Sequence, residues 1–281
     1  MKKKYTNKFA VTLVYPEGYI HSLALLEIAE TINYALINLG RDSILTTNLD
    51  FPDRIQIILG AHLLNNNLIK KINSNAIIYN FEQIDPESPW LSNNYLNILK
   101  TYATWDYSIN NIKQLNFLGI KNIKHLELGY VDQINRIVKQ PIQDIDVLFY
   151  GSINPRREFI LNELKNLGLN VVALFGVYGS ARDEFISRSK LVLNIHFYNS
   201  KIFEIARISY LLANGICVLS ETGNDPIEQH YANSLLFSPY EKLVENCLFL
   251  IKNQDQREQY CTQGQATMKT FSQETMIAKL I

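Results

Sequence analysis

The feature that most restricts the fold of this chain is a regular alternation of short, almost wholly apolar runs with longer segments of helical periodicity. A continuous apolar run fits a strand that is buried on both faces of a sheet, whereas a strand with one wet face alternates apolar and polar residues. Strands and helices that alternate in this way are typical of parallel sheets covered by helices on both faces. The sequence therefore predicts an α/β fold.

The alternation occurs twice, separated by residues 131–144, which are polar, contain Pro141 and show no clear period. We predict two Rossmann-like, doubly wound parallel-sheet domains that face each other across a cleft. The N-terminal domain is expected at 1–135, the C-terminal domain at 145–270, and a last helix at 271–281 that packs back on the N-terminal domain. The strands are expected at 9–15, 43–46, 54–59, 76–80, 104–109, 124–128, 146–150, 170–175, 191–195, 217–220 and 235–237. The helices are expected at 22–39, 90–99, 111–118, 156–167, 182–190, 202–213, 240–252, 254–268 and 273–281.

The composition excludes several classes of protein. Hydrophobic residues make up 47% of the chain and charged residues 19%, with Lys+Arg and Asp+Glu both at 27. A disordered chain has lower hydrophobicity and higher net charge. A protein that mainly grips a nucleic-acid backbone usually carries a basic excess, so the neutral total argues against a nucleic-acid partner.

Three scattered cysteines, Cys217, Cys247 and Cys261, are too few for a disulfide framework and fit a reducing compartment. The basic start at residues 1–4 is followed by a short apolar run without a cleavage site of small residues, so it does not read as a signal peptide. No stretch approaches the ~18 apolar residues of a membrane span. We expect a cytoplasmic protein with no membrane span.

The first motif of chemical interest follows the strand expected at 146–150. Gly151 and Ser152 leave the strand, and Asn154 and Pro155 are suited to begin a helix. Arg156 and Arg157 then fall in the first helical turn, which is the unfavourable end of the helix dipole for cations. A bound anion would remove the conflict, because it would accept hydrogen bonds from backbone N–H groups and be stabilised by both the helix dipole and a guanidinium. Alternatively, Glu158 neutralises two solvated arginines.

Two further segments follow strands of the same series. Gly176 would allow a flat ligand to approach the backbone, with Tyr178 stacking on a base, unless this is an ordinary turn. In the third segment, Lys201, Glu204 and Arg207 share one side of an apolar helix, and His196 ends the preceding strand. Glu204 could accept hydrogen bonds from a ribose diol while Lys201 or Arg207 meets phosphate. The alternatives are a structural Glu204–Arg207 pair and a core histidine.

Four short runs form a further pattern within about residues 146–226: Leu191-Val-Leu-Asn194, Phe203-Glu204, Leu212-Ala-Asn-Gly215 and Val218-Leu-Ser-Glu221. This pattern resembles the donor-binding half of GT-B glycosyltransferases. The pattern is similar to a group-1-like subset with a single Phe-Glu motif. The resemblance implies transfer of a sugar from a nucleoside-diphosphate-sugar to a hydroxyl acceptor, which could be a glycan, a lipid-linked glycan, a protein or a small molecule. It implies that the donor sits mainly on the C-terminal domain.

The chain also departs from the retaining branch of that family. That branch has two glutamates eight residues apart, but His196 and Leu212 stand eight positions before and after Glu204. The stereochemical outcome therefore stays open. The lysine of the phosphate pair is not clearly placed either, and Arg156, Arg157 and Lys201 compete for its role.

The loop after the first strand is expected to hold the catalytic base. His21, at the start of the first helix, is placed to take a proton from an acceptor hydroxyl, a role worth ~10²–10⁴-fold in rate. Glu17 is its rival in the same loop, and Glu82 ends another strand. His21 could equally pack or cap the helix start.

The expected reaction needs no metal and no further cofactor. A helix N-terminus and arginines can stabilise a leaving diphosphate without one. The triplet Asp144-Ile-Asp146 could suggest a metal, but it lies at the entry of a strand, away from the expected ligand crevice. Two other functions stay open: a non-catalytic protein that binds a sugar nucleotide, and a glycosyltransferase that modifies nucleic acid.

Overall fold

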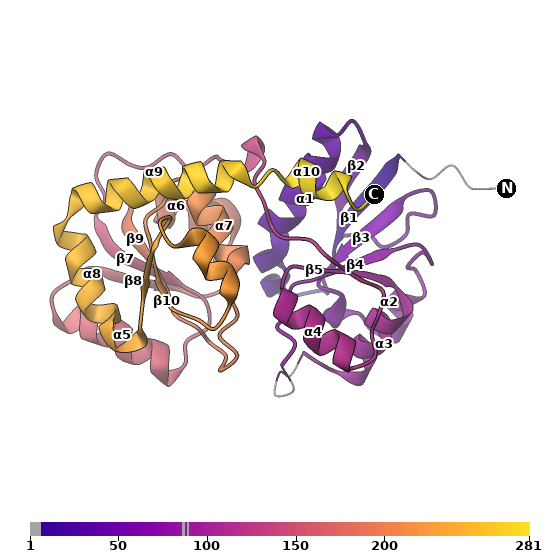
Figure 1. Ribbon diagram of the computed structural model, residues 1–281, viewed down its shortest axis with the longest axis horizontal. Helices are drawn as coiled ribbons and strands as arrows, with labels where there is room; N and C mark the ends of the chain where they lie inside the picture. The colour runs from indigo at the N-terminus through magenta and orange to yellow at the C-terminus, as the bar shows by residue number, and fades with distance from the viewer. Residues whose placement is uncertain (1–6, 86–87, 89) are drawn as a thin grey trace. The chain divides into compact units, whose positions relative to one another are not determined.

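The computed structural model describes residues 7–85, 88 and 90–281, so the basic start at residues 1–4 lies outside it. The chain forms two compact units (Figure 1). The first runs to Gln133 and also takes in Phe271–Ile281, and the second is Ile134–Thr270. Each unit is built on one parallel sheet, with helices between most successive strands; β2 and β3 are joined by a loop.

The sheet of the first unit has the strand order β2-β1-β3-β4-β5-β6, and each pair of neighbours is parallel. The chain moves from β1 to one side and then returns to the other side of β1 with β3. The carboxyl ends of β1 and β3 therefore form a switch point, where open α/β sheets bind ligands. The strands are β1 (Lys8–Leu13), β2 (Asp42–Thr46), β3 (Ile55–Leu59), β4 (Ile77–Asn80), β5 (Ala103–Asp106) and β6 (Ile123–His125).

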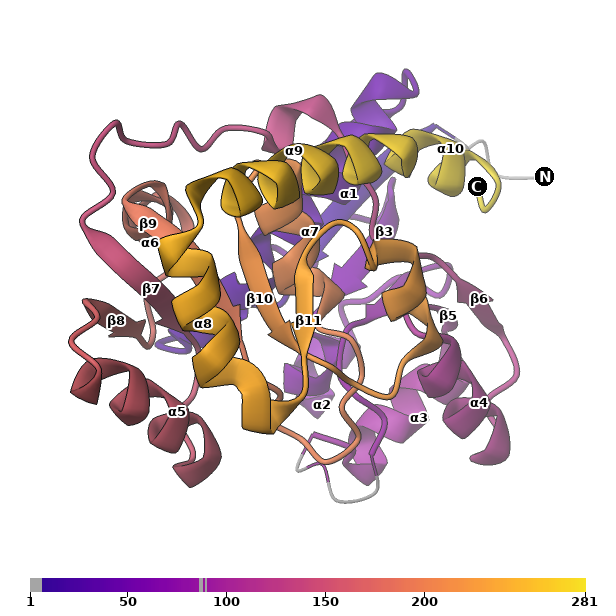
Figure 2. The ribbon, with the colours of Figure 1, turned by 60° about the vertical axis from the view of Figure 1, so that its left-hand side comes forward.

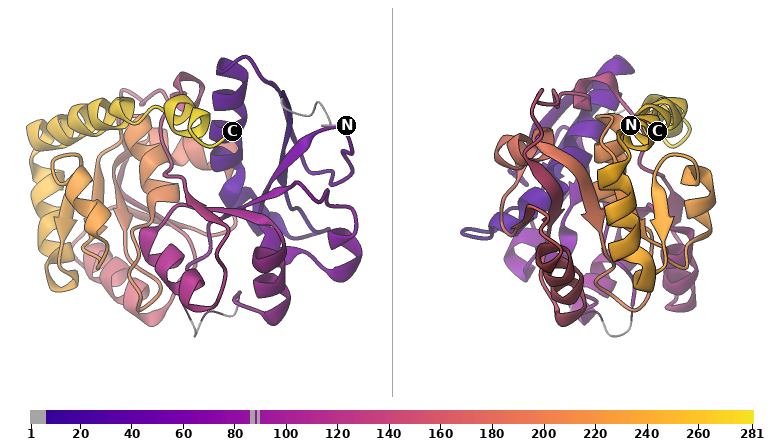
Figure 3. Two further views of the ribbon diagram at one scale, coloured as in Figure 1. Left: turned by 45° about the vertical axis from the view of Figure 1, so that its right-hand side comes forward. Right: turned by 90° about the vertical axis from the view of Figure 1, so that its left-hand side faces the viewer.

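Helices cover both faces of this sheet (Figure 3). On one face α1 (Leu26–Asn38) packs against β1 and β2. On the other face α2 (Asn66–Ile69), α3 (Asn93–Thr101) and α4 (Ile109–Phe117) share a core with β3 and β4. Ile58 and Ile78, from the two strands, and Leu99 and Leu115, from the two longer helices, are almost fully buried in that core.

The end of the chain is part of the first unit. Tyr130 and the terminal segment exchange backbone hydrogen bonds, from Tyr130 N to Phe271 O at 2.7 Å and from Gln273 N to Tyr130 O at 3.1 Å. Gly129 is required there, because a Cβ on it would lie 2.3 Å from Phe271 O. The last helix, α10 (Gln273–Ala278), then packs on α1.

The sheet of the second unit has the order β11-β10-β9-β7-β8, again parallel at each pairing. The chain passes from β7 to β8 and then crosses back over β7 to β9, which places the switch point at the ends of β7 and β9. The strands are β7 (Ile145–Tyr150), β8 (Val171–Leu174), β9 (Ser189–Asn194), β10 (Val218–Glu221) and β11 (Leu236–Ser238).

Helices cover this sheet on both faces as well (Figure 2). One face packs against α5 (Pro155–Asn166) and α8 (Leu243–Lys252), through a core that includes Phe149, Leu161 and Leu250. The other face carries α6 (Gly179–Ser187) and α7 (Ile205–Ala213), and α9 (Gln254–Thr270) packs on α7. Two α/β units with parallel sheets confirm the predicted fold class.

Some local predictions hold and others do not. Asn154 caps α5, because its side chain accepts a hydrogen bond from Arg157 N, and Pro155 follows it. The first long helix was expected to begin at residue 22, but a 3-10 helix, η1 (Ile20–Leu25), comes first, Ser22 is buried inside it, and α1 begins only at Leu26. The strand expected at 104–109 ends at Asp106, because Ser108 accepts a hydrogen bond from Asn111 N and starts α4.

One helical stretch, Ile20–Asn38, has the length and hydropathy of a membrane span, contrary to the expectation that no stretch would. Half of this stretch is buried in the structure. Its buried side chains include Ile28 and Ile32, which face the sheet core, and also Glu27.

Candidate functional site

The candidate site of the second unit lies at the carboxyl edge of its sheet. The loops after β7, β9 and β10 meet at this edge. The loop after β7 leads into the N-terminus of α5, and the loop after β9 leads into α7. Charged side chains from all three loops are in contact with one another, as described below.

Arg157 is the buried centre of this cluster, with a side chain only 4% exposed. Its guanidinium donates to Ile195 O, and it donates to Ser152 O at 2.8 Å. It also lies 3.4 Å from Glu204 Oε1 and packs over the rings of Phe149 and Phe197. Burial lowers the pKa of Arg157 to about 10, so this side chain remains cationic at neutral pH.

Arg156 points to the other side of the loop, where it forms a two-pronged ion pair with Glu221 at 2.8 and 2.6 Å. Glu221 is fully buried and also accepts from Lys201 Nζ at 2.9 Å and from His196 N at 3.1 Å. Burial raises the pKa of Glu221, but the hydrogen bonds from Arg156 and Lys201 outweigh it, and the pKa lies below its ordinary value. Both cations remain about a third exposed, at 33% each.

Glu204 and Arg207 form the third part of the cluster. Glu204 Oε2 lies 3.1 Å from Arg207 Nη1, which also donates to Asn194 Oδ1 at 2.7 Å. The sequence pattern had placed Glu204 within the helix. In the structure α7 begins only at Ile205, so Glu204 stands just before it. Four cations and two carboxylates meet at this edge, which leaves two positive charges unbalanced within the cluster.

His196 lies among these charges, and neither ring nitrogen has a hydrogen-bond partner among the described residues, although His196 is only 2% exposed. Its Nδ1 lies 3.9 Å from Glu204 Oε1, and burial lowers its pKa, so the ring is neutral at neutral pH. A Cβ on Gly223 would lie 3.0 Å from Nε2 and 2.4 Å from Lys201 O. Lys201 itself has a left-handed backbone, with φ of 45°. Such strain is common at functional sites.

Glycines shape the rest of this edge. Gly151 has φ of 134°, and a Cβ there would lie 3.0 Å from Arg207 Nη2, so a larger residue would be strained and would push on the cluster. Ser152 is exposed and contributes its carbonyl to Arg157. Gly176, with φ of 70°, and Tyr178, the residue before α6, follow the neighbouring strand β8.

The alternative in which Glu158 neutralises the two arginines is wrong, because Glu221 and Glu204 are their partners. Sequence reasoning did not include Glu221 among the site residues. Its signal was its place at the carboxyl end of β10, the position that the other site residues share.

The carboxyl edge of the first unit has a different character. His62 and Glu82, which follow β3 and β4, face each other with 3.3 Å between Nδ1 and Oε1. Burial raises the pKa of Glu82 to about 7 and lowers the pKa of His62 to about 4. Sequence reasoning named Glu82 but not His62.

A buried amide network supports this edge. Asp106, at the end of β5, accepts from Asn80 Nδ2 at 2.6 Å, from Asn111 Nδ2 at 3.2 Å and from Ser108 N at 2.8 Å. Burial raises the pKa of Asp106 to about 7 in spite of these bonds. Asn80 and Asn111 also donate to the backbone carbonyl of Glu82, so the loop after β4 is held in place.

The other two predicted base residues lie in the loop and helix after β1. Glu17 is exposed, and His21 is half-buried within η1 with its ring 5.4 Å from that of Tyr19. Burial and then the charge of Glu82 raise the pKa of Tyr19 in the same loop.

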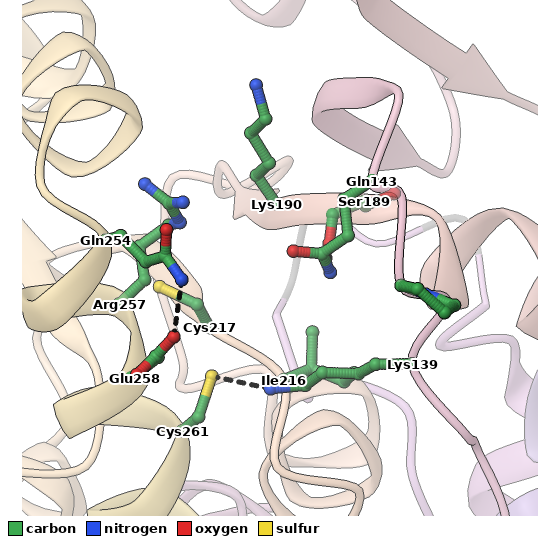
Figure 4. Close-up of a pocket in the computed structure, with 11 residues that line it drawn as sticks. Lys139, Gln143, Ser189, Lys190, Ile216, Cys217, Gln254, Arg257, Glu258 and Cys261 are labelled. Carbon is green, nitrogen blue, oxygen red and sulfur yellow. Dashed lines mark hydrogen bonds between the residues drawn. The ribbon is translucent and has the colours of Figure 1, made fainter.

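A cavity of about 270 Å³ lies at the opposite, amino edge of the second sheet (Figure 4). Lys190, from the start of β9, lines it, and the sulfurs of Cys217 and Cys261 face it. The Asp144-Ile-Asp146 triplet also lies at this edge, and its carboxylates pair with Arg188 and Lys190 at 2.6 Å each. Within residues 7–85, 88 and 90–281, no group of three or more His, Cys, Asp or Glu side chains could hold a metal.

The fold is similar to that of solved glycosyltransferase structures. A sucrose-phosphate synthase from Thermosynechococcus elongatus matches with a TM-score of 0.61 at 9% identity, over 98% of each chain. HepE from Anabaena, solved in complex with UDP-glucose, matches with a TM-score of 0.61 at 13% identity, over 97% of this chain and 96% of that one. AviGT4, a glycosyltransferase involved in Avilamycin A biosynthesis, gives 0.54 at 10% identity, over 97% and 98%. The chain therefore has the GT-B fold, and at this identity the similarity establishes the fold alone.

Relatives by sequence occur in Acanthamoeba polyphaga mimivirus. Uncharacterized protein L140 is 29% identical over 191 residues, which cover 64% of this chain and 60% of L140. Uncharacterized protein R358 is 30% identical over 159 residues, 54% of each protein. The chain thus spans less than two thirds of the length of these relatives. No protein-family model matches the chain.

Proposed function

We propose that this protein is a glycosyltransferase that moves a sugar from a nucleoside-diphosphate-sugar to a hydroxyl acceptor. The observation that carries the proposal is the charge cluster at the switch point of the second sheet, where four cations meet two carboxylates beside the N-terminus of α5. The diphosphate of a sugar nucleotide carries two negative charges, which match the two unbalanced positive charges of the cluster. The GT-B fold, and neighbours solved with UDP or UDP-glucose, support the same donor class.

The proposed mechanism follows from where charge develops. When the bond between sugar and diphosphate breaks, the leaving oxygen gains negative charge, and donors already in place at that oxygen lower the barrier. Arg156 and Lys201, each a third exposed, can reach a ligand, while Arg157 adds fixed positive charge from beneath. Glu204, 17% exposed, is placed to accept hydrogen bonds from a ribose diol. This charge supply is the reason to expect a metal-independent reaction.

Glu82 is the base that the geometry favours in the first unit. An ionised carboxylate takes the proton of the acceptor hydroxyl, whose oxygen attacks the anomeric carbon as the diphosphate leaves. A base works best with a pKa close to the working pH, and burial raises the pKa of Glu82 to about 7. The acceptor class, the cytoplasmic location and membership of the single Phe-Glu subset belong to the same proposal.

A matched pair of lysine variants tests the donor site. Lys201 and Lys190 are 33% and 32% exposed, and each pairs with one carboxylate, but they stand at opposite edges of the same sheet. Lys201→Met keeps the side-chain stem and removes the charge. A charge-assisted hydrogen bond is worth ~1.5–3 kcal/mol, so we expect Lys201→Met to weaken binding of UDP-glucose or another sugar nucleotide by about 10- to 100-fold, measured by calorimetry.

Lys190→Met is the control and should bind the donor as the wild type does. Equal affinities for the two variants, or no binding of any nucleoside diphosphate to the wild type, would overturn the proposed donor site. Donor binding without hydrolysis or transfer would instead identify a non-catalytic sugar-nucleotide-binding protein.

A further inference from the structure

The pairing of His62 with Glu82 has a role in the proposed reaction. Gly60, in a left-handed conformation with φ of 78°, turns the chain after β3 into a short 3-10 helix, η2 (Ala61–Leu63). This turn directs His62 toward the loop after β4, with Nδ1 3.3 Å from Glu82 Oε1. The His62 side chain is 8% exposed and that of Glu82 is 21% exposed, so the histidine is the buried member of the pair.

The backbone on which Glu82 stands is already fixed. Its carbonyl accepts from Asn80 Nδ2 at 3.0 Å and from Asn111 Nδ2 at 2.9 Å. Its N–H donates to Asn80 Oδ1 at 2.9 Å, and Asn111 Oδ1 accepts from Ile84 N at 2.9 Å. Only the side chain of Glu82 therefore needs a partner to fix its direction.

We propose that His62 is a positioning residue for Glu82: its Nδ1–H donates to Oε1 and leaves Oε2 directed to the hydroxyl of the acceptor. This inference rests on the proposed function. Aromatic rings hold the imidazole itself, since Trp90 lies 5.1 Å and Tyr95 5.9 Å from it, both in edge-to-face contact. A ring locked in this way can orient a carboxylate without moving.

Burial makes the histidine a neutral donor and not a second cation. Burial lowers the pKa of His62 to about 4, so the ring is neutral where Glu82 titrates, near 7. Among the described residues, the other titratable groups around Glu82 include Tyr19 from the first loop, Tyr95 from α3 and, beyond Asn80, Asp106 from β5. A hydrogen bond to the ionised form of an acid lowers its pKa. Loss of the His62 donor should therefore raise the pKa of Glu82.

Two variants separate positioning from packing. His62→Leu fills much of the space and removes the donor. His62→Asn keeps an N–H close to the place of Nδ1. The pKa of Glu82 is measured by NMR of carboxyl-labelled glutamate, with Glu82→Gln to assign the signal. The rate of UDP-glucose hydrolysis by the full chain is measured against pH, and the acid limb of this pH–rate profile gives a second value.

In His62→Leu we expect the titration of Glu82 and the acid limb of hydrolysis to move together to higher pH, by about one unit, with the rate at pH 7 reduced about 10-fold. His62→Asn should restore most of both, and the affinity for UDP should stay at the wild-type value in each variant. An unmoved Glu82 titration in His62→Leu, or a rate that falls equally at every pH, would overturn the proposal.

The same measurements distinguish failure of this inference from failure of the proposed function. If UDP-glucose neither binds nor reacts in the wild type, the glycosyltransferase assignment fails. The titration of Glu82 still decides whether His62 controls that carboxyl group.

Discussion

The two sheets present opposite electrostatics at the same topological position. At the carboxyl edge of the second sheet, Glu221 is surrounded by cations, and its pKa is held below its ordinary value. At the carboxyl edge of the first sheet, Glu82 and Asp106 have amide and imidazole partners, and burial raises the pKa of both to about 7. Glu221 therefore stays ionised at neutral pH, whereas Glu82 and Asp106 titrate there, as does Glu228 in the segment after β10, whose pKa burial raises to about 7.

The comparison shows how one fold can hold two chemistries. A switch point gives each sheet converging loops but does not specify which side chains they carry. Fixed cations suit a ligand that is anionic at every working pH, such as a diphosphate. A carboxyl group that titrates near neutrality suits proton transfer. The proposed division of labour between donor and acceptor sites would follow from the surroundings of a few carboxylates.

The largest expected effect comes from removing the carboxylate that titrates. Glu82→Gln should reduce the rate of transfer or of UDP-glucose hydrolysis by ~10²–10⁴-fold, because general base catalysis is worth that much. Affinity for UDP, measured by calorimetry, should not change, since the donor cluster lies in the other unit.

Glu17→Gln and His21→Gln are the controls for this variant, because these residues are the two other base candidates. Glu17 is exposed and His21 is half-buried. If Glu17→Gln or His21→Gln abolished turnover while Glu82→Gln stayed active, the base would lie in the segment after β1. The raised pKa of Glu82 would then have no role in proton transfer.

The next effect concerns the fixed charges. Glu221→Gln leaves Arg156 and Lys201 without their carboxylate, and breaking a fully buried pair costs ~3–5 kcal/mol. Because both cations are a third exposed and can be solvated, we expect a loss of about 2 kcal/mol in the free energy of unfolding at pH 7.

The pH dependence of that loss is a further check on Glu221. A lowered pKa contributes stability above the ordinary value of the group, and this stability disappears as pH falls through the lowered pKa. The cost of Glu221→Gln in denaturant unfolding should therefore shrink in acid. A cost that is equal at pH 3 and pH 7 would show that the ion pairs do not provide the stability.

The smallest effect is a stability change of opposite sign in the first unit. Burial raises the pKa of folded Glu82 from its ordinary value to about 7, so wild-type stability should fall as pH rises from the ordinary carboxyl range and level off above about pH 7. Glu82→Gln removes this loss, so its stability relative to wild type should rise by about 1–2 kcal/mol between pH 5 and pH 7 and stay level at higher pH, measured by urea unfolding. Glu17→Gln should show no such gain, and a gain in both variants would refute burial as the cause.

Much of the fold could be predicted from the sequence, because fully apolar strands and helix-ending glycines are local signals. The 3-10 turn before α1 could not, because Ser22 is equally suited to cap a helix and to be buried inside one. Glu204 was read as a helix residue from its spacing to Arg207, but the preceding loop, with the left-handed Lys201, delays the helix to Ile205.

The site was only partly predictable, for a different reason. Arg156, Arg157, Lys201 and Glu204 stand in motifs that can be read along the chain. Glu221 and His62 acquire their roles only when strands far apart in sequence become neighbours, since Glu221 is 65 residues from the arginine it pairs with. A single carboxylate after an apolar strand gives no sequence signal of its partner.

The pairing of Arg156 with Glu221 also bears on how the proposed enzyme would finish a cycle. The carboxylate already occupies both terminal nitrogens of the guanidinium, so a spent nucleotide would have to share them with a competitor built into the protein. Such competition would limit the affinity of the site for the product nucleotide. In many enzymes the departure of product sets the pace of turnover, and here a buried glutamate would help to displace it.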